Sequence, residues 1–158
     1  MDHLDLLERV ELKKKLTPID RVLATTSGSI TQALEAYLGE PIKIRTIAQE
    51  VKEAGEFAGV LGVEKSEATN FREVEIMDSR GRVLIRAKSW TPLMRLEPEF
   101  KDDLMKADIP IGKLLSKHKI EARRELLDVG LHEGKLRRTY NIIRNGKVLM
   151  RIEETFES

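Results

Sequence analysis

The chain has 158 residues, of which 41% are hydrophobic, enough to build the buried core of the single domain that we expect over residues 1–158. Charged residues make up 35% but sum to a net charge of only +1, which excludes the strong field of a typical nucleic-acid or membrane-surface protein. Cysteine is absent, which excludes disulfides, and neither a membrane span nor a signal peptide is recognisable, so we expect a cytoplasmic protein without nucleic-acid or membrane partners.

The first part of the chain predicts three helices. Apolar residues three and four positions apart predict an N-terminal helix within residues 1–16, which Thr17-Pro18 interrupts. Ser27 or Ser29 is suited to cap the third helix, and Gly39 is suited to end it. The predicted helices span Leu4–Leu16, Ile19–Ala24 and Thr31–Leu38.

Segments of alternating apolar and polar residues predict strands in the rest of the chain. Ser79-Arg80-Gly81 predicts the turn of one hairpin, and Asn145-Gly146, a pair that favours type I′ turns, predicts a second. Gly130 and Gly134 bracket a further turn, and the segment before them is compatible with a strand or a partial helix. The predicted strands span residues 42–51, Phe71–Asp78, Arg82–Thr91, Lys119–Val129, Arg137–Arg144 and Lys147–Phe156.

Two further helices are predicted between the hairpins, over Glu97–Lys106 and Ile111–Lys117. Gly55, Gly59 and Gly62 indicate an irregular segment after the first strand. Consecutive hairpins with helices between them predict an α+β domain, in which helices pack on one face of an antiparallel sheet.

Two charged residues lie on strand faces that the alternation assigns to the core. Arg72 shares its face with Val74, and Glu154 shares its face with Ile152, because side chains two positions apart on a strand point the same way. Burying a charge is costly unless the charge is paired or used. The pattern therefore predicts a closed pocket, with a few polar groups, for a small acidic molecule.

Each of these charges has a structural and a functional interpretation. Arg72 either pairs with a carboxylate such as Glu154 or holds a ligand carboxylate through two parallel hydrogen bonds. A two-residue turn in the last hairpin places Ile143 opposite Val148 and Arg137 opposite Glu154. Glu154 is then either the partner of Arg137 or a general acid or base whose pKa is raised by burial.

Other kinds of site have little support. The three histidines are far apart and no cysteine is present, so we expect neither a metal site nor a cofactor. Ser29 lacks the second glycine of a nucleophile elbow. The helix starts at Ser29-Ile30-Thr31 and Pro110-Ile111-Gly112 expose backbone N–H groups, which attract anions, although an ordinary capped helix is the simpler interpretation of each.

A series of short segments extends from the first predicted loop to the last strand. In this order and spacing the segments resemble chorismate lyase and, more closely, the archaeal and actinobacterial branch of the chorismate pyruvate-lyase-like proteins, from about Leu16 to Phe156. The segments are Ser27-Gly28-Ser29-Ile30-Thr31, Phe71-Arg72-Glu73-Val74, Ala87-Lys88-Ser89, Ile109-Pro110-Ile111-Gly112, Leu127-Asp128-Val129-Gly130 and Ile152-Glu153-Glu154-Thr155-Phe156.

The resemblance implies a six-stranded antiparallel sheet around a buried site, where pyruvate is removed from chorismate to leave 4-hydroxybenzoate without a cofactor or metal. It implies that Arg72 holds the ring carboxylate, that Glu154 lies near the ring 4-hydroxyl, and that backbone groups at Ile30 and Ile111 complete the pocket. Counting from the hairpin turn selects Glu153 for the acidic position, whereas the inward parity of the strand selects Glu154.

The effector-binding domains of GntR-type transcription regulators share this fold and bind small acids or sugars without turnover, so a small-acid sensor is the alternative function. Only about 16 residues precede the predicted fold, so we do not expect a DNA-binding domain ahead of it. A third alternative is a structural relative in which Arg72 and Glu154 pair with each other, because a fold alone does not determine function. The sequence indicates neither the exact substrate nor the oligomeric state.

Overall fold

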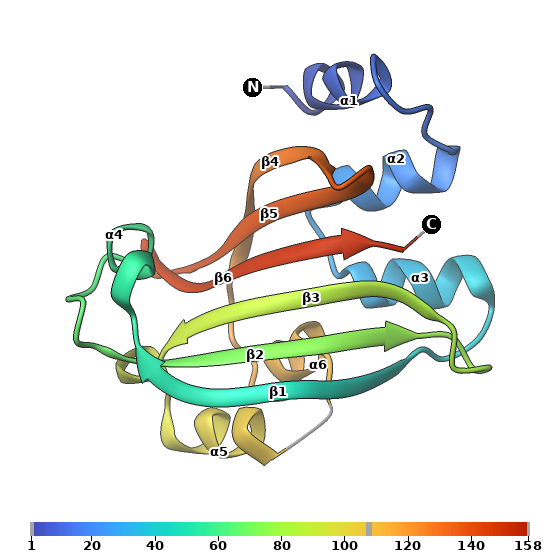
Figure 1. Ribbon diagram of the computed structural model, residues 1–158. Coiled ribbons are helices and arrows are strands. Elements are labelled where there is room, and N and C mark those ends of the chain that lie inside the picture. The colour runs from blue at the N-terminus through green and yellow to red at the C-terminus, as the bar shows by residue number, and fades with distance from the viewer. Residues whose placement is uncertain (1, 107–108, 158) are drawn as a thin grey trace.

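A computed structural model describes residues 2–106 and 109–157, which form an α+β fold around a six-stranded antiparallel sheet (Figure 1). The strand order is β1-β2-β3-β6-β5-β4, so the two predicted hairpins meet where β3 pairs with β6. This confirms the predicted fold class. The strands are β1 (Lys43–Glu53), β2 (Ala68–Met77), β3 (Val83–Pro92), β4 (Arg123–His132), β5 (Lys135–Arg144) and β6 (Lys147–Phe156).

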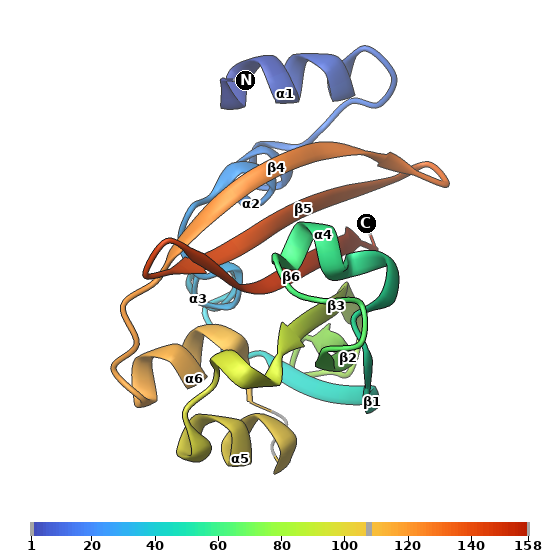
Figure 2. The same cartoon turned by 90° about the vertical axis from the view of Figure 1, so that its left-hand side faces the viewer.

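The helices lie mainly on one side of the sheet. Figure 2 shows α2, α3, α5 and α6 on that side, whereas α4 lies on the other. The segment that contains α4 was predicted to be irregular. Phe57, just before α4, stacks on Trp90 with ring centroids 4.2 Å apart. The segment therefore covers an apolar end of the otherwise polar face of the sheet. The helices are α1 (His3–Glu11), α2 (Pro18–Thr25), α3 (Ile30–Leu38), α4 (Ala58–Leu61), α5 (Pro98–Lys106) and α6 (Ile111–Lys117), with 3₁₀ turns at Gly55–Phe57 and Leu93–Arg95.

Several predicted boundaries are wrong, among them the start of β4, which lies at Arg123 rather than Lys119. The first helix ends at Glu11 rather than Leu16, because Thr17 begins a capping box for α2 and the chain before it is extended, which buries Leu16 to 1% exposure. Gly130 does not bracket a turn but lies inside β4. The turn is made by Glu133 and Gly134, whose φ angles of 52° and 78° give the left-handed geometry of a tight hairpin.

The last hairpin contains a β-bulge that changes its register. Val148 faces Ile143 as predicted, but the next pair is Met150 with Ile142, so one extra residue, Leu149, is accommodated on β6. From there to the end of the strand every partner is displaced by one position. The partner of Glu154 is consequently Arg138 and not Arg137, which corrects the register predicted from the turn alone.

The face of the sheet away from α3 and α6 is largely ionic. Glu75 accepts hydrogen bonds from Arg45 on β1 and Arg86 on β3. The hydrogen bond from Arg45 is the main reason that the pKa of Glu75 lies below its usual value, although burial opposes the shift. Glu153 faces Lys88 on this side, so the parity of β6 turns Glu153 outward and Glu154 inward.

The apolar core lies on the helix-covered face and forms two clusters. One contains Leu34, Ile76 and Phe156, and the other contains Phe100 and Ile142, each together with neighbouring aliphatic residues. Residues of both clusters line the cavity described next, so packed apolar side chains surround its few polar groups.

Candidate active site

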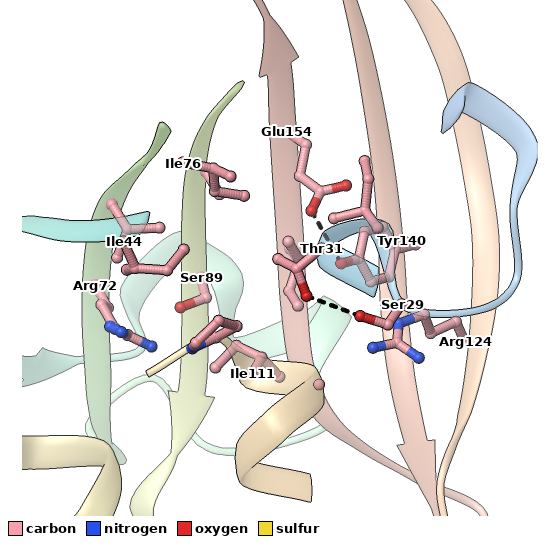
Figure 3. Close-up of a pocket in the computed structure, with 16 residues that line it drawn as sticks. Ser29, Thr31, Ile44, Arg72, Ile76, Ser89, Ile111, Arg124, Tyr140 and Glu154 are labelled. Carbon is pink, nitrogen blue, oxygen red and sulfur yellow. Dashed lines mark hydrogen bonds between the residues drawn. The ribbon is translucent and has the colours of Figure 1, made fainter. Parts of the chain in front are cut away.

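A cavity lies between the middle of the sheet and the starts of α3 and α6 (Figure 3). Its volume is about 50 Å³, which is room for a few water molecules, so a ring-sized ligand has to displace some of the lining side chains. Its walls are aliphatic, with a small number of polar groups. The polar side chains that line it are Ser29, Thr31, Arg72, Ser89, Arg124, Tyr140 and Glu154.

The structure brings together all four residues that were selected from the sequence. Arg72 of β2, Glu154 of β6, Ile30 at the start of α3 and Ile111 at the start of α6 line the same cavity. Glu153, the alternative acidic residue, lies on the opposite face of the sheet. The placement of the four residues is therefore observed, while their roles in binding and catalysis stay predictions.

Arg72 connects the sheet to the segment that precedes α6. Its side chain is buried, with 2% exposure, and its Nη2 donates a hydrogen bond to the Ile109 carbonyl oxygen at 3.1 Å. Figure 3 shows the guanidinium directed from β2 toward the cavity, near Ser89 of the neighbouring strand. A buried guanidinium in this position is suited to hold a carboxylate against the sheet.

Glu154 forms a buried ion pair with Arg138. The Arg138 Nε donates to one carboxylate oxygen at 2.6 Å, and the Tyr140 hydroxyl donates to the other at 3.2 Å. The exposed fractions of the two charged side chains are 3% and 1%. The predicted pairing of Glu154 with Arg137 is wrong, and so is the alternative that Arg72 is its ionic partner.

Further contacts fix Arg138 and Tyr140. The Arg138 Nη1 donates to the Thr26 carbonyl oxygen at 3.0 Å, and its Cζ lies 4.6 Å from the centre of the Tyr140 ring. Burial, reinforced by the negative charge of Glu154, raises the pKa of Tyr140, so its hydroxyl remains a neutral donor. Burial alone lowers the pKa of Arg138, but Glu154 and Tyr140 outweigh it and the pKa of Arg138 lies above its usual value.

Two side chains of the cavity, Arg124 and Tyr140, were not selected from the sequence. Arg124 lies in a segment whose sequence was compatible with a strand or a helix. A regular strand counted back from the buried Val129 would point Arg124 outward. The bulge between Leu126 and Asp128 reverses this parity, so Arg124 points inward. The sequence pattern could have identified Tyr140 as an inward residue. It shares one face of β5 with buried Leu136 and Ile142, a period of two that is typical of an inward strand face.

The starts of α3 and α6 approach each other closely beside the cavity. Ser29 caps α3 by accepting a hydrogen bond from the Gln32 N–H, and its hydroxyl lies 2.9 Å from that of Thr31. A Cβ atom at Gly112 would lie 2.8 Å from the Ser29 Oγ, closer than such atoms approach in proteins. Glycine is therefore the residue that allows α6 to begin against Ser29.

We expect Gly112→Ala to lower the free energy of unfolding by about 1–3 kcal/mol, because the added methyl group overpacks the contact with Ser29. Gly59→Ala is the matched control, since a Cβ at Gly59 of α4 meets no atom within 4 Å and alanine favours a helix. Urea unfolding of the two variants measures the difference. Equal stabilities would show that the two helix starts separate at little cost.

Within residues 2–106 and 109–157, no three His, Asp or Glu side chains gather in a way that could hold a metal ion. The expectation that no cofactor takes part stays a prediction. In the same part of the chain, no helix is long and apolar enough to cross a membrane.

Solved structures share this fold. The effector domain of PhnF from Mycobacterium smegmatis superposes with a TM-score of 0.65 at 16% sequence identity, over 84% of this chain and 90% of that domain. The longer PhnF chain gives a TM-score of 0.66 at 16% identity. The match covers 83% of this chain but only 64% of that PhnF chain. The C-terminal domain of the histidine utilization repressor from Pseudomonas syringae gives 0.55 at 10% identity, over 73% of this chain and 90% of that domain.

The sequence itself has a closer relative. A Methanocaldococcus jannaschii protein that bears the name "Putative lyase MJ0807" is 35% identical in an alignment of 156 positions that covers 87% of this chain and 77% of the relative. The family described as "Chorismate pyruvate-lyase Rv2949c-like" matches residues 24–158, a range that includes the entire sheet and every residue of the cavity. The chain therefore belongs to the chorismate pyruvate-lyase Rv2949c-like family.

Proposed function

We propose that the protein is a chorismate pyruvate-lyase, which converts chorismate to 4-hydroxybenzoate and pyruvate in the cavity between the sheet and the starts of α3 and α6. The observation that carries the proposal is the meeting of Arg72 and Glu154, 2% and 3% exposed, in one cavity. The two charges come from different halves of the sheet, and family membership supplies the reaction class.

Arg72 binds the ring carboxylate in this proposal. Its planar guanidinium matches the two oxygens of a carboxylate, and its burial removes competing water, so the interaction is stronger than on a protein surface. The first backbone N–H groups of α3, next to Ile30, add partial positive charge beside the ring. The ring is thereby oriented with its 4-hydroxyl and C4 toward Glu154.

Glu154 then accepts the proton of C4. As that proton leaves, the ring becomes aromatic, the bond between C3 and the ether oxygen breaks, and the side chain departs as the enolate of pyruvate, which takes up a proton at its methylene carbon. Aromatisation provides much of the driving force, so the protein needs mainly to orient the substrate and move one proton. Tyr140 and Arg138 hold the Glu154 carboxylate in position for this transfer.

The test is incubation of the purified protein with chorismate, with 4-hydroxybenzoate followed by its ultraviolet absorbance and pyruvate by a coupled assay. We expect the two products in equal amounts. Arg72→Met should lower kcat/KM by about 30- to 4,000-fold, the equivalent of roughly 2–5 kcal/mol for losing one partner of a buried charge contact. Arg80→Met, in the exposed turn between β2 and β3, is the control that should keep full activity.

The second candidate function is a small-acid sensor, which the shared fold of the PhnF effector domain favours. A sensor would form no product from chorismate, yet chorismate or 4-hydroxybenzoate would raise its melting temperature. Arg72→Met would then abolish that shift in melting temperature.

A further inference from the structure

Two arginines lie on opposite sides of the cavity. Figure 3 shows Arg72 of β2 on one side and Arg124 of β4 on the other, with Ile111 between them at the start of α6. They belong to different halves of the order β1-β2-β3-β6-β5-β4, since β2 is its second strand and β4 its last, so the curvature of the sheet brings them to one site. The cavity thus has a guanidinium group at each end.

Arg124 has no carboxylate partner in the part of the chain that the structure describes. The nearest acidic residue in sequence, Glu125, points to the other face of β4, where it accepts a hydrogen bond from Arg123 at 3.3 Å. The Arg124 Nε is buried and, among the described residues, has no hydrogen-bond acceptor. Arg124 as a whole is half-buried, but burying this one N–H group without an acceptor is costly unless a ligand oxygen accepts its hydrogen bond.

The groups around Arg124 leave it accessible from the cavity. A Cβ atom at Gly112 would lie 3.5 Å from the Arg124 Nη2, so the bare glycine backbone forms the wall beside the guanidinium. Arg124 is also close enough to the Tyr140 hydroxyl for its charge to counter, in part, the effect of burial on the pKa of Tyr140. Arg138 differs from Arg124 in having a carboxylate partner: it donates to Glu154 and to the Thr26 carbonyl oxygen, although its Nη2 is also buried without an acceptor among the described residues.

We infer that Arg124 is the specificity-determining residue for a second carboxylate, so that the cavity selects aromatic or cyclohexadiene dicarboxylates over monocarboxylates. The inference rests on the proposed function and extends it, because it assigns the enolpyruvyl carboxylate of the substrate to Arg124 and the ring carboxylate to Arg72. A guanidinium at each end of the cavity also fixes the orientation of the ring between them.

The test compares two stable ligands that differ by one carboxymethoxy substituent, which carries the second carboxylate. These are 4-hydroxybenzoate and 3-(carboxymethoxy)-4-hydroxybenzoate, whose aromatic ring prevents turnover, and their dissociation constants are measured by calorimetry. Arg124→Met should weaken the dicarboxylate by about 10-fold or more while changing the affinity for 4-hydroxybenzoate by less than about 3-fold. Arg72→Met should weaken both ligands, and Arg123→Met, on the exposed face, should weaken neither.

Arg124→Lys provides a further readout, because it keeps the charge and should restore part of the affinity for the dicarboxylate. Equal weakening of both ligands by Arg124→Met, or of neither, would overturn the assignment. The outcome is separable from that of the proposed function, since selective binding of the dicarboxylate can be measured whether or not chorismate is converted. Unchanged selectivity in an active enzyme would refute the role of Arg124 alone.

Discussion

Arg138→Met is expected to lower the free energy of unfolding by about 3–5 kcal/mol, because it leaves the buried Glu154 carboxylate without its cationic partner. The variant also removes the hydrogen bond to the Thr26 carbonyl oxygen, which links β5 to the loop after α2. Urea unfolding at neutral pH, followed by circular dichroism, measures the loss.

Arg137→Met is the matched control. Arg137 precedes Arg138 in the sequence but lies on the outer face of β5, so its replacement should change stability by less than about 0.5 kcal/mol. Combining Arg138→Met with Glu154→Leu should recover much of the lost stability, since two apolar groups of similar size can replace a buried ion pair. A larger effect at Arg137 than at Arg138 would contradict the bulged register of the last hairpin.

Glu154→Gln is expected to lower kcat for chorismate conversion by about 100- to 10,000-fold, because the amide keeps the shape of the side chain but cannot accept the C4 proton. The measurement is the steady-state rate of pyruvate release, made below the unfolding transition of the variant. Calorimetric binding of 4-hydroxybenzoate provides the second readout and shows that the cavity is still formed.

Glu153→Gln is the control for this experiment, because Glu153 occupies the adjacent position on the outer face of the sheet. It should retain the wild-type kcat. If Glu154→Gln kept more than a tenth of the wild-type rate, Glu154 would be a binding or structural residue and the proton acceptor would have to be sought elsewhere in the cavity.

Strand parity predicted which side chains point inward wherever the strands are regular. The alternation around Arg72 continues without interruption, and the end of β6 is regular from Met150 onward, so both inward charges were found. Two bulges account for the principal errors. The bulge at Leu149 changed the partner of Glu154, and the bulge near Leu127 hid Arg124.

Such bulges are difficult to predict from a single sequence because their cause is tertiary. An extra residue is accommodated where the curvature of the sheet and the packing of the helices favour it, and the local pattern of apolar residues changes little. The close approach of the two helix starts at Gly112 has the same origin, since neither helix determines the position of the other. The composition of the site was therefore partly predictable, whereas its pairings required the structure.

The strand order divides the site between two halves of the sheet. Arg72 belongs to the half built from β1, β2 and β3, and Glu154 and Arg124 belong to the half built from β6, β5 and β4. These halves meet along the β3–β6 pair. A ligand that contacts residues of both halves bridges the β3–β6 pair. Its binding free energy therefore also stabilises the association of the two halves. In the proposed complex the ligand and the sheet therefore stabilise each other across the β3–β6 pair.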